Sequence, residues 1–239
     1  MATWTHENGV FWPDQLARDI NTARIMTFGY DADVVKIWGM AGGDNLRDHG
    51  KSLAFKVSNQ RQLCKERPII FIAHSLGGLV SEQALLHCRE GNKNLKNVFP
   101  STRGIIFMGT PHAGSDLTKF GKNLAKLLNI VRNTNSAILG PLQKGSDELT
   151  GVQQQFQQLA FEHRDNLEIF CFYESKAVVG VGVIVPQYSA TLSQYSNQSI
   201  AANHLDMTKF SGTNDDGYQS VLCEVRNMIE GMNSSNTCM

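Results

Sequence analysis

The stretch Pro68-Ile69-Ile70-Phe71-Ile72-Ala73-His74-Ser75-Leu76-Gly77-Gly78 decides the fold of this chain. An apolar run followed by small residues predicts a buried strand that turns abruptly into a helix, with the serine at the turn. Small neighbours let strand and helix meet closely and let the serine adopt a strained backbone conformation. The N–H groups that begin the helix can hold developing negative charge. Ser75 is therefore predicted to be a nucleophile; the alternative is an ordinary turn with a surface serine.

This arrangement resembles the nucleophile elbow G-x-S-x-G of the α/β-hydrolases, with Ala73 in place of the first glycine. Short apolar runs elsewhere predict further strands, and apolar residues at helical spacing predict helices. Strands that alternate with helices indicate an α/β protein with a mostly parallel sheet flanked by helices. The predicted strands are 23–28, 68–72, 103–108, 167–173 and 183–186, and the predicted helices are 46–66, 76–89, 117–131, 152–161 and 217–232.

The length of 239 residues fits one α/β domain over 1–239. Residues 117–165 predict an inserted helical pair that caps the active site. Its first helix has one apolar face, with Lys119, Lys122 and Lys126 on other positions. For this helix a plain packing role and contact with a membrane surface are the alternatives.

Composition excludes several classes of protein. Lys+Arg and Asp+Glu both number 22, so no nucleic-acid partner is expected. The 5 cysteines are odd in number and lack C-x-x-C spacing, which favours reduced thiols over disulfides or a zinc site. No metal or cofactor is expected. Residues 1–7 do not resemble a secretory signal, and the apolar stretch 178–186 is too short to span a bilayer. We expect an intracellular, cytoplasmic protein.

A serine nucleophile needs a base and an orienting carboxylate. In α/β-hydrolases the chain order is serine, acid, histidine. Glu174 ends the predicted strand 167–173 and is the last carboxylate before His204, which alone among the histidines follows it. Asp206 is the rival acid and His112 the rival base.

These residues predict a mechanism. His204, oriented by Glu174, takes the proton of Ser75, whose oxygen attacks an ester carbonyl. The Leu76 N–H contributes to the oxyanion hole, and water then releases the acyl group. We expect His74 to pack against the elbow and His112 to shape the pocket.

Matching stretches through most of the chain resemble the lipase-like, serine-active-site-containing (SERAC-like) proteins, including esterase domains that precede NACHT modules in fungal NLR-like proteins. The resemblance implies a triad of Ser75, Glu174 and His204. It also implies lipid or other apolar ester substrates, peripheral membrane contact, and an association with mitochondria or the endoplasmic reticulum. The stretches that carry it are Thr3-Trp4-Thr5, Phe11-Trp12-Pro13, 24–30, 68–80, 107–112, 172–174 and 203–210.

One departure from the family concerns the oxyanion hole. Related proteins carry strands and a His-Gly-Leu-Gly-Gly-like loop just before Thr-Trp-Thr, and this loop donates the second N–H. Here Met1 stands directly before Ala2 and Thr3. We therefore expect a sheet without those strands and an oxyanion hole in which Leu76 alone is accounted for. A catalytically impaired signalling or interaction module and a lipid acyltransferase are the alternatives to a serine hydrolase.

Overall fold

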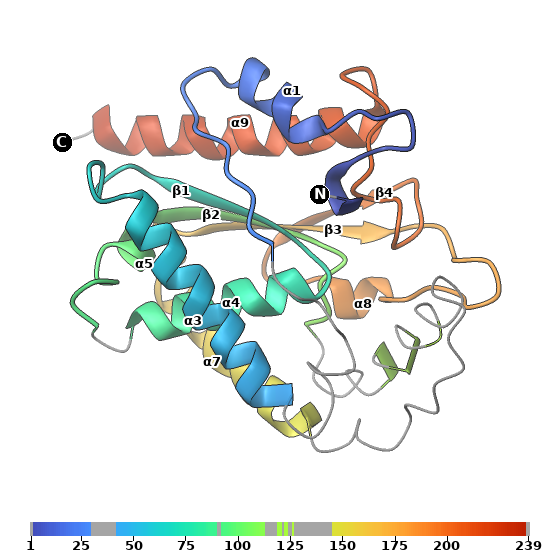
Figure 1. Cartoon of the computed structure of the whole chain (residues 1–239), viewed down its shortest axis with the longest axis horizontal. Helices are drawn as coiled ribbons and strands as arrows, with labels where there is room; N and C mark the ends of the chain where they lie inside the picture. Colours follow the sequence, from blue (N-terminus) through green and yellow to red (C-terminus); the bar gives the residue numbers. More distant parts are fainter. Residues whose placement is uncertain are drawn as a thin grey trace.

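The computed structural model describes residues 2–29, 42–89, 92–112, 119, 120, 122, 123, 126 and 145–237. Its centre is a parallel sheet of 4 strands in the order β1-β2-β3-β4 (Figure 1). Parallel neighbours need crossover connections, and each of the three contains at least one helix. The strands are β1 (Ile69–His74), β2 (Thr102–Met108), β3 (Glu168–Glu174) and β4 (Ser196–Ile200).

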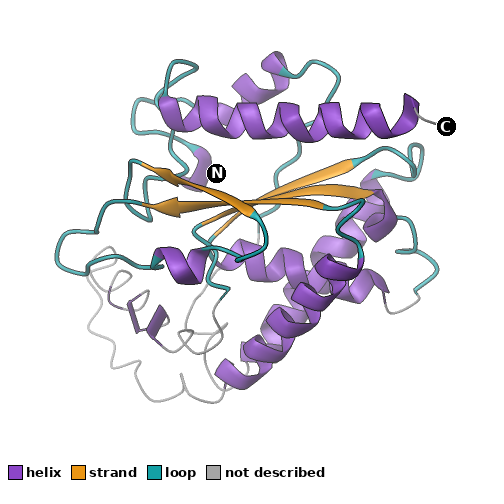
Figure 2. Ribbon diagram, turned by 180° about the vertical axis from the view of Figure 1, so that it is seen from behind, coloured by secondary structure: helices purple, strands orange, loops and turns teal. Residues whose placement is uncertain are grey.

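Helices cover both faces of the sheet, as predicted (Figure 2). The short α1 (Trp12–Asp19) and the long α9 (Asp216–Thr237) cover one face, and three longer helices cover the other. Those three are α3 (Gly42–Gln60), α4 (Leu76–Arg89) and α7 (Gly145–Glu162). The shorter elements are the 3-10 helix η1 (Ala2–Trp4), α5 (Val98–Ser101) and α8 (Gln187–Ala190).

The side chains of β1 point alternately to the two faces of the sheet, and they explain why helices cover both faces. Ile70 and Ile72 pack into the cluster beneath α1 and α9, whereas Ile69 and Phe71 pack into the cluster beneath α3 and α4. Strand side chains point alternately to opposite faces, so a strand with apolar residues at every position needs both faces covered. The parallel α/β architecture predicted from the sequence is therefore confirmed.

Residues 23–28 do not form the predicted strand. The segment passes from one face of the sheet to the other at the free edge of β1. Ile25 packs with the α9 side and Phe28 with the α3 side. A segment that crosses an edge instead of running along it cannot form a ladder. Within the described ranges no strand precedes β1.

Two further predictions differ from the structure. Residues 183–186 form no strand, because the N–H groups of Ile184 and Val185 donate to the carboxylate of Glu174 and are not free for a ladder. The last strand is β4, a polar and mostly exposed segment without a hydrophobic pattern.

The predicted cap, residues 117–165, lies partly outside the described residues, which here are 119, 120, 122, 123, 126 and 145–165. Its last part is α7, which packs against α4 and buries Phe156 and Leu159 in a cluster with Phe107 of β2. This helix therefore belongs to the layer that covers the sheet.

Candidate active site

Ser75 lies at the sharp turn between β1 and α4. Its φ of 54° makes it the one non-glycine residue with positive φ among the described residues. Such a conformation costs about 1–3 kcal/mol and persists only where the surroundings enforce it. Here the Ser75 N–H donates to the Met108 carbonyl at 2.9 Å, and Gly78 lets α4 approach closely, since a Cβ there would collide with the Thr110 side chain. The geometry is that of a nucleophile elbow on an α/β-hydrolase fold.

Two residues distant in sequence complete the arrangement. His204 Nε2 lies 2.9 Å from Ser75 Oγ, and His204 Nδ1 lies 2.6 Å from Glu174 Oε2. The imidazole and the carboxylate are almost fully buried. Ser75 follows β1 and Glu174 ends β3, so all three groups gather at the carboxyl edge of the sheet, where parallel sheets bind ligands.

The loop after β3 fixes the carboxylate of Glu174. Its Oε1 accepts the N–H of Ile184 at 2.5 Å and that of Val185 at 3.3 Å, while Oε2 faces His204. With both oxygens engaged, the carboxylate holds one orientation. A His204 that donates Nδ1–H to it presents an unprotonated Nε2 to the serine hydroxyl, as a general base requires.

His74 supports the same histidine from the side. Its Nε2–H donates to the backbone carbonyl of His204 at 2.9 Å, and the two ring centroids are 4.9 Å apart. Burial, together with the neighbouring His204, lowers the pKa of His74 to about 3. His74 is therefore neutral at physiological pH and places no charge beside His204.

The rival acid and base are engaged elsewhere. Asp206 binds Lys209 and Asn203, each at 2.9 Å, and has no hydrogen bond to the His204 ring. His112 Nδ1 lies 3.0 Å from Glu82 Oε1, in the interior beside the site. The structure thus brings Glu174 and His204, not their rivals, to Ser75.

Leu76 is the first residue of α4, so its N–H has no intrahelical acceptor. It stands directly beside the serine, where an oxyanion would form. Sequence reasoning missed the N–H groups of Ile184 and Val185, since backbone donors leave no side-chain signal. It also missed Glu82, whose one signal was its position on the helix that follows the serine.

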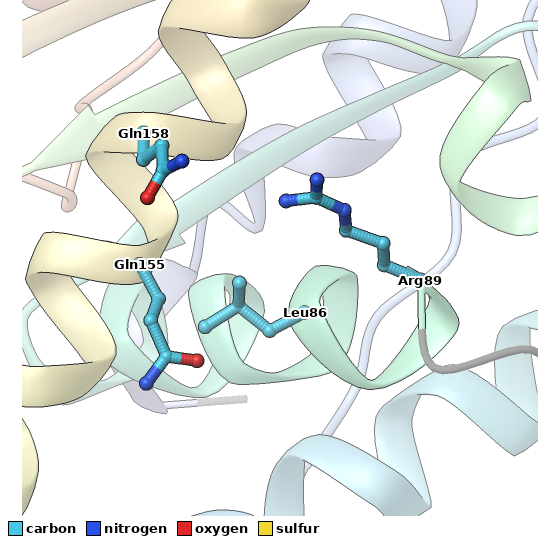
Figure 3. A pocket seen from close by; sticks show the side chains of 4 residues that line it. All are labelled: Leu86, Arg89, Gln155 and Gln158. Carbon is cyan, nitrogen blue, oxygen red and sulfur yellow. The ribbon is translucent and has the colours of Figure 1, made fainter.

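A cavity of about 170 Å³ lies away from these residues, between the C-terminal half of α4 and α7 (Figure 3). Leu86 and Arg89 come from α4, and Gln155 and Gln158 from α7. Leu86 is 11 residues beyond Ser75, which at 1.5 Å per residue is roughly 15 Å along the helix. This cavity is therefore separate from the Ser75 site.

No helix within the described part of the chain has the length and apolar character needed to cross a bilayer.

The chain is similar in sequence to several known proteins. Protein SERAC1 of Bos taurus and of Homo sapiens are each 28% identical to the chain over 228 residues, 91% of its length. The chain spans about a third of these relatives, 33% of each. A solved lipase of Bacillus licheniformis in its propeptide form shares 23% identity, covering 69% of this chain and 38% of its own, with a TM-score of 0.43. Residues 40–161 match the family described as "Putative serine esterase (DUF676)". The chain belongs to that family.

Proposed function

We propose that this protein hydrolyses carboxylic esters through Ser75, His204 and Glu174. The observation that carries the proposal is the continuous chain of contacts from the serine hydroxyl through the imidazole to the carboxylate, 2.9 Å and 2.6 Å long in its two steps. A serine hydroxyl is a weak nucleophile until an oriented base accepts its proton. The family membership supports the same reaction class.

The reaction begins when His204 Nε2 takes the proton of Ser75 as Oγ attacks the ester carbonyl carbon. The Leu76 N–H, at the N-terminus of α4, stabilises the oxyanion. Collapse of this intermediate breaks the ester C–O bond, and His204 returns the proton to the leaving alkoxide. Water, deprotonated by His204, then attacks the acyl-enzyme and releases the acid. Glu174 stabilises the imidazolium in both halves.

We propose an apolar acyl group for the substrate. The ring centroid of Phe120 is 6.3 Å from that of His204, and Phe120 belongs to the apolar cluster against which Val178, Val181 and Leu205 also pack. Phe120 therefore places apolar surface beside the histidine. We also propose that residues 1–239 act as one catalytic domain, in which Phe120 lies against the acyl group.

A fluorophosphonate probe tests the nucleophile directly. We expect it to label the folded protein, and Ser75→Ala to abolish the label. Folded protein that does not react would contradict the proposal and favour a non-catalytic module. With labelling established, p-nitrophenyl esters of increasing chain length test the acyl group. The rate should rise with chain length; a preference for acetate would contradict an apolar acyl site.

We further propose that the carboxyl edge of the sheet contacts an anionic lipid surface. The loop after β3 exposes apolar side chains: Val179 is 93% exposed, Tyr188 61% and Val183 39%. Exposed lysines lie around this loop. Asn123 lies against this loop, because its side-chain amide donates to the Val183 carbonyl. The exposed cations are Lys119, Lys122, Lys126 and Lys176. No Asp or Glu occurs between Glu174 and Asp206.

Vesicle binding tests this contact. We expect the Ser75→Ala protein to sediment with vesicles that contain phosphatidylserine. Lys119→Gln/Lys122→Gln/Lys126→Gln should then lose roughly a hundredfold in affinity, at about a factor of five per lysine. The matched control is Lys65→Gln/Lys93→Gln/Lys96→Gln, which removes the same charge from exposed residues that precede β1 and β2 at the opposite edge. Equal losses in both triple variants would contradict a specific contact.

A further inference from the structure

The loop Gly109–His112, which follows β2, lies directly against His204. Gly109 has φ of 58°, and a Cβ on it would lie 3.1 Å from two atoms of the His204 ring and 2.9 Å from the sulfur of Met207. The backbone of this loop therefore forms the surface against which the imidazole rests. Any displacement of the loop moves His204 relative to Ser75.

Every residue of the loop is held by another element. The Gly109 N–H donates to the Phe172 carbonyl of β3 at 2.8 Å, and the Thr110 side chain packs against Gly78 of α4. The Pro111 carbonyl accepts the side-chain amide of Gln153, which belongs to α7. The His112 N–H donates to the Ser189 carbonyl of α8 at 2.6 Å. The loop thus joins the elements around the Ser75 site.

The side chain of His112 ends this loop inside the protein. Its Nδ1 lies 3.0 Å from Glu82 Oε1, and the two side chains are 2% and 1% exposed. Its ring stacks edge-to-face on Phe107, with centroids 4.6 Å apart. A buried carboxylate and imidazole are costly to separate, because either one alone would lose its partner in a site that water does not reach. The pair therefore fixes the end of the loop to α4.

Burial lowers the pKa of His112, but contacts with Cys171 and Glu82 outweigh this and raise it to about 9. Burial also raises the pKa of Glu82. Both directions mean that the pair retains a proton at neutral pH.

We propose that the buried Glu82–His112 pair is a positioning device that sets the His204 imidazole against Ser75 through the loop Gly109–His112. The expected change in labelling rate rests on the proposed function, whereas the expected change in the position of His204 does not. His112 itself contacts none of the reacting groups. It acts through the loop on His204, and Glu82 links it to the same helix that begins at the nucleophile.

The test compares three variants by their rate of fluorophosphonate labelling, at a temperature where each is fully folded. His112→Asn shortens the side chain and detaches it from Glu82, and we expect labelling to slow by about ten- to a hundredfold, as a misplacement of up to 1 Å would cause. Glu82→Gln keeps an acceptor for His112 and should lose less than about threefold, which is the conservative rescue. Tyr218→Phe is the control: it removes a partly buried hydrogen bond to Asp19 on the opposite face. It should lower thermal stability without slowing the labelling.

A second readout needs no activity. The proton between His204 and Glu174 should give a downfield ¹H NMR resonance, identified by its loss in His204→Asn. His112→Asn should shift or broaden it, and Tyr218→Phe should leave it unchanged. If the wild type does not react with the probe, the proposed function fails and the resonance alone decides this inference. A His112→Asn protein with wild-type labelling and an unshifted resonance would overturn it, as would an unshifted resonance alone where the wild type is unreactive.

Discussion

The carboxyl edge of the sheet holds two buried glutamate–histidine pairs that look alike and differ in what surrounds them. In both, the histidine Nδ1 faces a glutamate oxygen, at 2.6 Å for His204–Glu174 and 3.0 Å for His112–Glu82. The His204 ring faces a serine hydroxyl with its other nitrogen, whereas the His112 ring lies against Phe107 and beside the Cys171 thiol. A buried imidazole with a carboxylate partner is therefore not by itself a catalytic base. The group at Nε2 decides its role.

The largest expected effect is a difference in kcat between variants of the two glutamates. Glu174→Gln should lower kcat for a p-nitrophenyl ester by roughly ten-thousandfold, because an amide cannot stabilise the imidazolium or hold its tautomer. Glu82→Gln should lower kcat by less than about threefold, since it alters a group that only positions the loop. Steady-state kinetics of both variants measures the contrast. Similar losses in the two would mean that the pairs do not differ in role.

An effect of intermediate size is expected at Gly109. This residue lies against the His204 ring and begins the loop that ends at His112. Gly109→Ala places a methyl group against the His204 ring at a residue with positive φ. We expect labelling by a fluorophosphonate to slow by up to about a hundredfold, with a loss of stability of about 1–2 kcal/mol from the left-handed conformation. Gly151→Ala is the control, because a Cβ there meets no atom within 4 Å. Labelling unchanged in Gly109→Ala would show that the loop does not set the position of His204.

The last expected effect is a pH dependence of stability that comes mainly from His112. Its pKa is about 9 in the folded protein against 6.5 for an ordinary histidine. A raised folded-state pKa stabilises the fold fully below pH 6.5, and the contribution disappears as the pH rises to about 9. The loss amounts to at most about 3 kcal/mol. Urea unfolding at pH 6 and pH 9 should show it in the wild type, and His112→Asn should remove most of it. An equal slope in both proteins would assign the dependence to other groups.

Chain order and local pattern were enough to predict the elbow, three strands, and the meeting of Ser75, Glu174 and His204. The strands were predicted at 68–72, 103–108 and 167–173, and they lie at 69–74, 102–108 and 168–174. These predictions succeed because a parallel sheet brings its strand ends to one edge whatever the detailed packing. The strand predicted at 23–28 is absent because this segment crosses the edge of β1. A segment forms a ladder only where it runs alongside a neighbouring strand. The strand predicted at 183–186 is absent because its N–H groups bind Glu174.

Other features of the structure correspond to no pattern in the sequence. The fourth strand, Ser196–Ile200, is polar and mostly exposed, so neither apolar content nor alternation indicated it. Glu82 lies on a helix, where a carboxylate is usually solvated; its burial against His112 depends on a loop that begins more than 20 residues later. The contact between Glu82 and His112 depends on tertiary packing, and the periodicity of apolar residues does not indicate it.

The path of residues 24–29 has a consequence for the behaviour of the protein at high concentration. The outer edge of β1 carries backbone groups that can pair with a strand from another molecule, the usual start of edge-to-edge aggregation. Because Ile25 and Phe28 pack on opposite faces, the segment between them crosses this edge and interrupts it. We therefore expect this segment to hinder the pairing of an incoming strand with β1, the strand that leads to the nucleophile.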